Sequence, residues 1–455
     1  MKYAAYRSYE PSESQWLDKL PAHWKQLRIK HVIERMESGV SVNSDAVPAS
    51  SDELGVLKTS CVYGDQFVPT ENKRVLDDEL DRVTCHVKAD QLIVSRMNTP
   101  ELVGSCGYVA QDYPNLYLPD RLWQTIFNKS CECVPKFAWY YLTSRPAKSA
   151  ISSLAAGTSG SMQNIAQDAF MGISFPLPPL EEQQAITRFL DAKTAQIDTL
   201  VAKKRQLIDK LREKRGALIA RTVTRGLPPE AAKAVGLEPN PEMRDSGIDW
   251  LGLAPSHWVI KAIKWESPVQ RGASPRPIDD PVYFDDDGEY AWVRISDVTA
   301  AGMYLENTEQ KLSEIGSSLS VKMEPGSLFL SIAGSVGKPC ITKIKCCIHD
   351  GFVYFPRWKG DPRFLFYIFA SGEPYKGLGK MGTQLNLNTD TVGSIVIGVP
   401  PPAEQSAIAD FLDRETSALD GLIGTIESAI HRLTEYRQAL ITSAVTGKIN
   451  VRGVA

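Results

Sequence analysis

The sequence predicts an α+β protein: two mixed α/β domains joined by two long antiparallel coiled-coil helices, with a pseudo-twofold internal repeat. The segment 178–223 recurs as 400–445 with a constant shift of 222 residues. Both copies carry apolar residues at alternating steps of four and three, which is the spacing of a coiled coil. A second motif, W-L-x-x-x-P-x-H-W, begins at Trp16 and again at Trp250. A period of half the chain is too long for a solenoid and indicates two copies of one large module.

The repeated segments begin with a diproline, which stops a preceding helix and suits a first helical turn. The first predicted helix ends near Gly226, where Gly-Leu-Pro-Pro is a stop signal. About 40 residues at ~1.5 Å each give a rod of roughly 60 Å. The simplest partner for each helix is the other copy, packed antiparallel. The expected apolar stripe consists of Ile186, Leu190, Ile197, Leu200, Leu207, Leu211 and Leu218 in the first helix, and Leu412, Leu419, Leu422, Ile426, Leu433, Tyr436 and Leu440 in the second.

Short apolar runs edged by Gly, Asp and Pro predict strands between these boundaries. The runs 55–60 and 91–96 of the first module correspond to 290–296 and 327–332 of the second. Each module then has a predicted helix, a polar Gly-rich loop and a short strand before the diproline. The expected organisation is a first mixed domain at 1–177, a helix at 178–226, a linker at 227–247, a second mixed domain at 248–399, and a helix with a C-terminal tail at 400–455.

Composition and charge exclude several classes of protein. The 455 residues carry a net charge of −3, and no apolar run approaches the roughly 20 residues that cross a bilayer. The N-terminus has no signal-peptide core, so we expect a cytoplasmic protein without a membrane partner. The eight cysteines form no CxxC pair and have no zinc-type spacing. Buried free thiols, without a metal, are therefore expected.

Charge is distributed unevenly between the two long helices. Nine basic side chains lie between Lys203 and Arg225, against only Asp209 and Glu213, whereas the second helix is slightly acidic. A solvated helix face is one explanation for such a run. A face that lies along an acidic polymer is the other.

The sequence contains no recognisable set of catalytic residues. Residues 333–338 (AGSVGK) resemble a phosphate loop, but Ile332 and Pro339 stand where the pattern needs Gly and Ser or Thr. Glu71-Asn72-Lys73 has the Glu-x-Lys spacing of a nuclease, yet Pro119-Asp120 follows it instead of preceding it. His23 and His257, each between Pro and Trp motif positions, are expected to pack the start of a domain. The chain is therefore expected to be the recognition part of a larger machine and not an enzyme.

The order of these motifs resembles the DNA-specificity subunit of a type I restriction–modification system. The resemblance rests on W-x-x-x-P-x-H-W, a variable domain and PLPPLEEQQAI with its helix, followed by PSHW, a second variable domain and PPPAEQSAI ending in AVTGKINVR. The second module carries WVRISDV (292–298), LFLSIAGSVGK (328–338) and GTQLN (382–386). In the first module RMNTPELVG (96–104) replaces the S-x-x-G-x-x-G-K stretch, so the resemblance there is weaker.

The resemblance implies that each mixed domain is a target-recognition domain for one half of a bipartite, asymmetric site in double-stranded DNA. The helices would set the distance between the half-sites and dock two methyltransferase (modification) subunits. Two restriction (translocase and nuclease) subunits would complete the complex. S-adenosylmethionine, ATP and Mg²⁺ are expected on those partners, and this chain itself would hold no cofactor.

Candidate base-reading residues follow from side-chain chemistry, because Arg and Lys pair with guanine, and Asn and Gln with adenine. Polar loops beside framework strands are where such groups are expected. Lys338 suits a phosphate better than a base, and Asn164 and Asn386, equivalent under the shift of 222, also suit loop capping. The candidates are Lys58, Arg96, Asn98, Ser159, Gln163 and Asn164 in the first module, and Arg294, Ser331, Ser335, Lys338, Gln384 and Asn386 in the second.

Two other functions stay open. The alternative is a non-catalytic coiled-coil tether or regulatory protein whose DNA-reading surfaces have decayed. A cryptic nuclease is the third interpretation and depends only on the spacing around Glu71.

Overall fold

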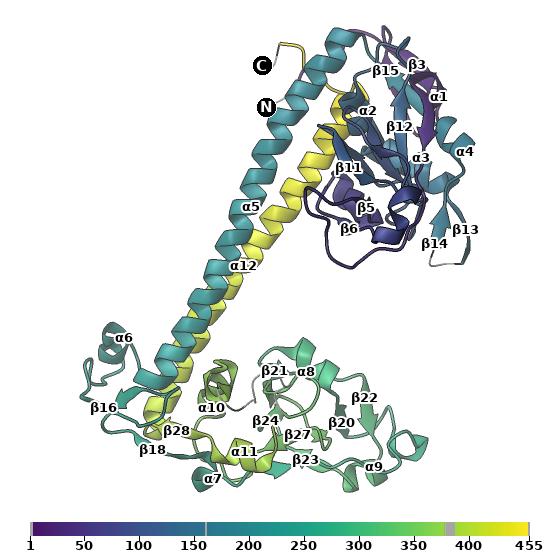
Figure 1. Cartoon of the computed structure of the whole chain (residues 1–455). Coiled ribbons are helices and arrows are strands. Elements are labelled where there is room, and N and C mark those ends of the chain that lie inside the picture. The colour runs from purple at the N-terminus through teal and green to yellow at the C-terminus, as the bar shows by residue number, and fades with distance from the viewer. Residues whose placement is uncertain (1–2, 160–161, 377, 379–386, 454–455) are drawn as a thin grey trace. The chain divides into compact units, whose positions relative to one another are not determined.

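The computed structural model of the protein describes residues 3–159, 162–376, 378 and 387–453. The chain forms two compact units. The first unit comprises residues 1–204 and 428–455, and the second comprises 205–427. Each unit therefore contains one mixed α/β domain and one half of each long helix, α5 (Leu180–Arg225) and α12 (Pro402–Val445) (Figure 1). None of the described helices is both long and apolar enough to cross a membrane.

The first unit is built on a four-stranded sheet of order β10-β8-β12-β4 and a second of order β6-β5-β11-β7. In the second sheet β5 and β11 are parallel. A three-stranded sheet, β13-β14-β9, and the pairs β1-β2 and β3-β15 complete it. The strands are β1 (Tyr9–Pro11), β2 (Lys19–Pro21), β3 (Lys25–Arg28), β4 (Ile33–Glu37), β5 (Gly55–Leu57), β6 (Asn72–Arg74), β7 (His86–Val87), β8 (Leu92–Ser95), β9 (Met97–Asn98), β10 (Cys106–Tyr108), β11 (Tyr113–Tyr117), β12 (Leu122–Phe127), β13 (Ala156–Ser159), β14 (Met162–Asn164) and β15 (Ser174–Leu177). The helices are α1 (Ile29–Val32), η1 (Thr59–Asp65), η2 (Asp77–Arg82), α2 (Pro135–Leu142), α3 (Arg145–Leu154) and α4 (Gln167–Met171).

The second unit repeats the two larger sheets, one of them with β21 as a fifth strand. Its sheets have the orders β19-β27-β24-β25-β21 and β22-β20-β26-β23, and β20 and β26 are parallel as β5 and β11 are. The strands are β16 (Met243–Asp245), β17 (Leu253–Pro255), β18 (Val259–Ala262), β19 (Gln270–Arg271), β20 (Tyr290–Val293), β21 (Tyr304–Leu305), β22 (Gln310–Leu312), β23 (Val321–Met323), β24 (Leu328–Ser331), β25 (Pro339–Thr342), β26 (Cys346–Ile348), β27 (Phe352–Tyr354) and β28 (Val396–Val399). The helices are α6 (Pro229–Ala234), α7 (Ile263–Glu266), η3 (Pro281–Tyr283), α8 (Ile295–Ala301), α9 (Glu314–Ser318), α10 (Pro362–Ala370), η4 (Glu373–Tyr375) and α11 (Thr389–Ser394).

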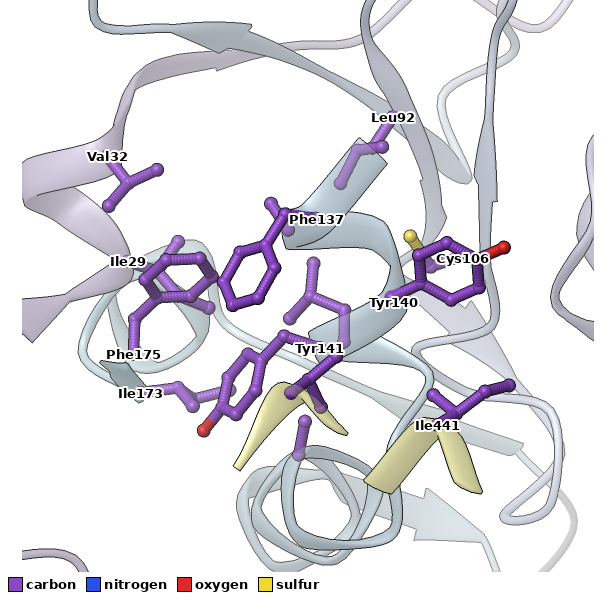
Figure 2. Packing of buried hydrophobic residues seen from close by; sticks show 14 of the residues in the cluster. Ile29, Val32, Leu92, Cys106, Phe137, Tyr140, Tyr141, Ile173, Phe175 and Ile441 are labelled. Carbon is purple, nitrogen blue, oxygen red and sulfur yellow. The ribbon is translucent and has the colours of Figure 1, made fainter. Parts of the chain in front are cut away.

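One hydrophobic cluster in each unit joins the mixed domain to the long helices. Strands β8 (LIVS) and β24 (LFLS) are buried along their whole length, as expected for a strand covered on both faces. In the first unit, Phe137 of α2 packs edge-on against Phe175 of β15, and Ile441 of α12 belongs to the same cluster (Figure 2). In the second unit, Ile219 and Val223 of α5 pack with the α10 phenylalanines.

Hydrogen bonds of the Glu-Gln pair in the diproline motif hold the start of each long helix against its domain. His23 lies 2.9 Å from a buried carboxylate oxygen of Glu182, and His257 lies 2.8 Å from one of Glu404. Both histidines therefore bridge a domain to a helix. Cysteines in the described residues are free, and burial raises the pKa of Cys347 to about 11.

The seam between α5 and α12 is antiparallel within each unit, and its register corrects the expected stripe. Seven expected positions are buried: Ile186, Leu190, Ile197, Leu211, Leu412, Ile426 and Leu440. Three more are half-buried: Leu218, Leu419 and Leu433. The remaining four are exposed: Leu200, Leu207, Leu422 and Tyr436.

Where an expected position is exposed, the next residue along the helix is the more buried one. Val201 and Ile208 of α5 are at least half-buried, and so are Ile423 and Arg437 of α12. The resulting positions are still separated by three, four or seven residues, so the spacing is that of a coiled coil, but part of the predicted register is wrong. The reason is that apolar residues border both sides of the seam, and only the partner helix decides between them.

Candidate nucleic-acid interface

A basic residue follows the same strand in both units. Lys58 follows β5, and Arg294 follows β20, which occupies the equivalent place in its sheet. Each lies at the N-cap of a short helix, η1 or α8. The two sheets therefore place a cation at equivalent carboxyl ends of their strands.

In the first unit, η1 brings the segment after Lys58 next to the segment after β8. The hydroxyl of Tyr63 in η1 contacts the hydroxyl of Thr59 at 3.3 Å and accepts a hydrogen bond from the Asn98 side-chain amide at 3.1 Å. Asn98 is buried, and its amide also donates to Ser95. The side chain of Asn98 is thus committed to holding the loop together, although its role in binding DNA stays a prediction.

The pairing of β14 with β9 brings two more predicted residues, Gln163 and Asn164, to this place. Gln163 is paired with Asn98, and Asn164 with Met97. The side-chain carbonyl oxygens of Gln163 and Asn164 are buried and have no hydrogen-bond partner within the described residues. The guanidinium of Arg96 lies over the Trp123 ring at 5.6 Å. Ser159 pairs with Met162 at the end of β13.

In the second unit, the loop between β24 and β25 meets α8. Ser331 is buried, accepts a hydrogen bond from the Lys338 amide at 3.1 Å and donates to the Ser335 carbonyl, so it closes the loop. The Lys338 ammonium donates to the Thr299 carbonyl at 2.8 Å. The exposed Ser335 hydroxyl lies 3.3 Å from the Thr299 hydroxyl. Gln384 and Asn386 lie outside the described residues.

We call these two groups the strand-end clusters. The first contains Lys58, Tyr63, Arg96, Asn98, Gln163 and Asn164, and the second contains Arg294, Thr299, Ser335 and Lys338. The sequence did not point to Tyr63 or Thr299. Both residues lie in the short helix that follows a strand of the sheet. Only the structure shows that this helix carries them to the cluster.

A carboxylate lies beside the first cation of each cluster. Glu71 lies 3.7 Å from the Lys58 ammonium and accepts a hydrogen bond from Ser60 at 2.6 Å. Glu309 forms an ion pair with Arg294, whose pKa is raised by the hydrogen bond to that carboxylate. Glu71 is therefore occupied by neighbouring side chains. No cluster of three or more metal-ligating side chains occurs in the described ranges.

The clusters are polar and cationic, and they lie on loops held by a rigid framework. Such an arrangement can contact base edges or phosphates, since Arg, Lys, Asn and Gln are the side chains that do so. The second unit adds a cavity of about 770 Å³ beside Arg294, lined also by Trp292, Gln310 and His349.

The chain is similar to several known proteins. A family model described as type I restriction modification DNA specificity domain matches residues 22–210 and 272–432. The chain is 22% identical over 335 residues to the type I restriction enzyme EcoKI specificity subunit of Escherichia coli K12, across 70% of this chain and 66% of that protein. It is 24% identical over 303 residues to the type I restriction enzyme MjaVIII specificity subunit of Methanocaldococcus jannaschii, across 63% and 64%.

Both alignments span slightly less than two thirds of those relatives. A chain in a solved structure, described as the structural basis of complex assembly and conformational transition of the type I R-M system, matches with a TM-score of 0.66 at 16% identity. That match covers 94% of this chain and 99% of the other, and it supports the same fold.

Proposed function

The chain belongs to the family of type I restriction modification DNA specificity domains, and we propose that it reads a bipartite, asymmetric DNA site for such a system. The observation that carries the proposal is the duplication of the strand-end cluster. One fold presents Lys58 and its neighbours in the first unit, and Arg294 with different neighbours in the second. Two equivalent surfaces with different side chains suit two half-sites of different sequence.

The partners in this proposal are double-stranded DNA, two methyltransferase subunits and two restriction subunits. The partners supply S-adenosylmethionine, ATP and Mg²⁺, and extrude the target adenines for methylation. This chain contributes recognition only. Linking two readers on one chain makes the second contact intramolecular, so that two modest affinities combine into a strong one.

We propose the exposed surfaces of α5 around Leu200 and of α12 around Leu422 as the docking surface for the methyltransferase subunits. Leu200 and Leu422 are equivalent under the shift of 222, and both are exposed, with 43% and 46% of their surfaces accessible. Equivalent apolar positions on the two halves favour two copies of one partner.

The test is reconstitution with the methyltransferase of the same source. Native mass spectrometry is expected to show two methyltransferase copies for each copy of this chain, and a single copy would contradict the proposal. The complex is expected to retain a small set of sequences from a randomised double-stranded DNA library. A decayed tether, the second candidate, would assemble the complex but retain DNA without sequence preference.

A further inference from the structure

In both units a glutamate lies beside the cation that follows the equivalent strand. Glu71 directly precedes β6, and Glu309 directly precedes β22; these strands are equivalent neighbours of β5 and β20. Lys58 and Glu71 are 3.7 Å apart, and Arg294 and Glu309 form the corresponding ion pair. The pair is thus a property of the fold position, while the residue types around it differ between the units.

Stability does not account for this repetition. The Glu309 side chain is 75% exposed and Arg294 is 35% exposed. Exposed ion pairs contribute little to stability, because water screens the charges and two long side chains lose freedom. A carboxylate on a face that approaches phosphates also weakens DNA binding by repulsion. A glutamate at this position needs another role to offset that cost.

Orientation provides such a role. An arginine reads guanine through two parallel N–H donors, so its guanidinium must lie in one plane relative to the base edge. Glu309 accepts from one terminal nitrogen of Arg294, and the Asp297 carboxylate lies 3.8 Å from Nε. These two contacts restrict the orientation of the guanidinium, and so also the direction of its remaining N–H donors.

We propose that Glu71 and Glu309 are positioning residues that fix Lys58 and Arg294 for base recognition, each within its own unit. The inference rests on the proposed function, since it needs a chain that reads DNA. It adds that specificity at one base pair of each half-site depends on a carboxylate that does not itself contact the base.

Glu309→Gln is the primary test, because it removes the charge and leaves the size and one acceptor. The reconstituted complex is challenged with a randomised double-stranded DNA library, and the selected sequences are counted. A bidentate contact gives a preference of about 5- to 150-fold for its base, from ~1–3 kcal/mol. Glu309→Gln is expected to reduce the preference at one position by about fivefold or more, and to leave the other half-site unchanged.

The matched control is Glu306→Gln. Glu306 belongs to the same unit and pairs with Lys343 at 2.7 Å, and its side chain is also exposed. This variant is expected to leave the selected sequences unchanged. In the first unit Glu71→Gln has a counterpart in Glu53→Gln, which removes a carboxylate paired with Arg74 at 3.2 Å.

The double variant separates positioning from direct reading. If Glu309 acts through Arg294, then Arg294→Gln/Glu309→Gln loses no more preference at that position than Arg294→Gln alone. Additive losses would show that Glu309 reads a base itself, for example the cytosine amino group, and would overturn the proposal. An unchanged Glu309→Gln profile in a complex that still selects DNA would overturn it too, while the proposed function would stand. Absence of selection by the unmodified complex would instead refute the proposed function.

Discussion

The guanidinium of Arg215 in α5 lies 3.0 Å from the carboxylate of Asp420 in α12, within the second unit. The same pair recurs in the first unit, where Arg437 of α12 lies 2.9 Å from Asp198 of α5. The shift of 222 relates Arg215 to Arg437 and Asp198 to Asp420. The repeat therefore preserves a cross-helix ion pair and not merely an apolar stripe.

We expect this pair to contribute to the register of the helices more than to stability. Arg215 is 36% exposed and Asp420 53% exposed, so Asp420→Asn should cost at most about 1 kcal/mol in the free energy of unfolding. Arg215→Glu should cost more, because two carboxylates then face each other, and Arg215→Glu/Asp420→Arg should recover most of that loss. Chemical denaturation measures all three. A loss above ~2 kcal/mol for Asp420→Asn would contradict the expectation.

We expect Gln183 to contribute far more to the stability of the protein than the adjacent Gln184. Its side chain is buried, accepts a hydrogen bond from the Val134 amide at 2.8 Å and donates to the Glu132 carbonyl at 2.8 Å. Gln183→Leu leaves those backbone groups unsatisfied in the interior, which costs about 1–3 kcal/mol for each buried group.

Gln184→Leu is the matched control for this change, because Gln184 is exposed one position along the same helix. It should change the stability by less than ~0.5 kcal/mol. Hydrogen exchange of the start of α5 and of α2 locates the effect. Equal protection in the two variants would refute the assigned role of Gln183.

The sequence was sufficient for the repeat, the strand equivalences and the extent of the helices, because each depends on local patterns. The register of the seam was not available, since Leu200 and Val201 are both apolar and both fit a step of four or three. The choice depends on the partner helix, which brings Ile208 and Ile423 inward and leaves Leu207 and Leu422 outside.

The sequence predicts where the strand-end clusters lie better than it predicts which residues face outward in them. Lys58 and Arg294 follow strands that the sequence identifies. Ser331 and Asn98, chosen because they are polar and close to those strands, have their side chains occupied by internal hydrogen bonds. Nothing in a sequence distinguishes a polar group that faces solvent from one that closes a loop, because both occur beside the same strands.

Gly337 is expected to tolerate no side chain. It adopts a left-handed backbone with φ of 82°, and an added Cβ would lie 2.9 Å from the Tyr375 ring. Gly337→Ala should therefore cost about 1–2 kcal/mol for backbone conformation and a further 1–3 kcal/mol for overlap. Gly372→Ala should cost only the first amount, since Gly372 has φ of 72° and open space around it. Thermal unfolding compares them, and equal losses would contradict the overlap with Tyr375.

The second unit should lose stability as the pH falls toward 5. Burial lowers the pKa of His349, although the Asp350 carboxylate raises it and Arg271 lowers it further. The Nδ1 of His349 accepts a hydrogen bond from the Gly351 amide at 2.8 Å, which a protonated Nδ1 cannot do. The unfolded chain takes up a proton near the ordinary value of about 6.5, and the folded chain does so at a lower pH.

The stabilisation from neutral His349 is therefore complete above about pH 6.5 and is lost as the pH falls through the folded pKa. Hydrogen exchange of β26 and β27 between pH 7 and 5 measures this loss. His349→Gln should flatten the pH dependence in this range. Increased protection of these strands on acidification would show that the sign is wrong.

The basic face of α5 is expected to act on DNA through charge alone. Lys210, Lys214 and Arg221 are separated by four and seven residues, so they share one face of the helix, and all three are exposed. None has an ion-pair partner in the part of the chain that the structure describes. The shift of 222 places Arg432, Tyr436 and Ser443 on the equivalent face of α12, which carries one cation instead of three.

Lysines are depleted in protein–protein interfaces and common at phosphates, so this face suits a nucleic-acid backbone better than a protein. Each neutralised phosphate contributes about −0.9 to the slope of log K against log salt concentration. Changing the three residues to Gln in the reconstituted complex should make that slope shallower by about 1–3. The selected DNA sequences should stay the same, because phosphates carry no base identity. The matched change on α12, Arg432→Gln, should alter the slope by less than one. An unchanged slope in the triple variant would identify the basic run as a solvated helix face.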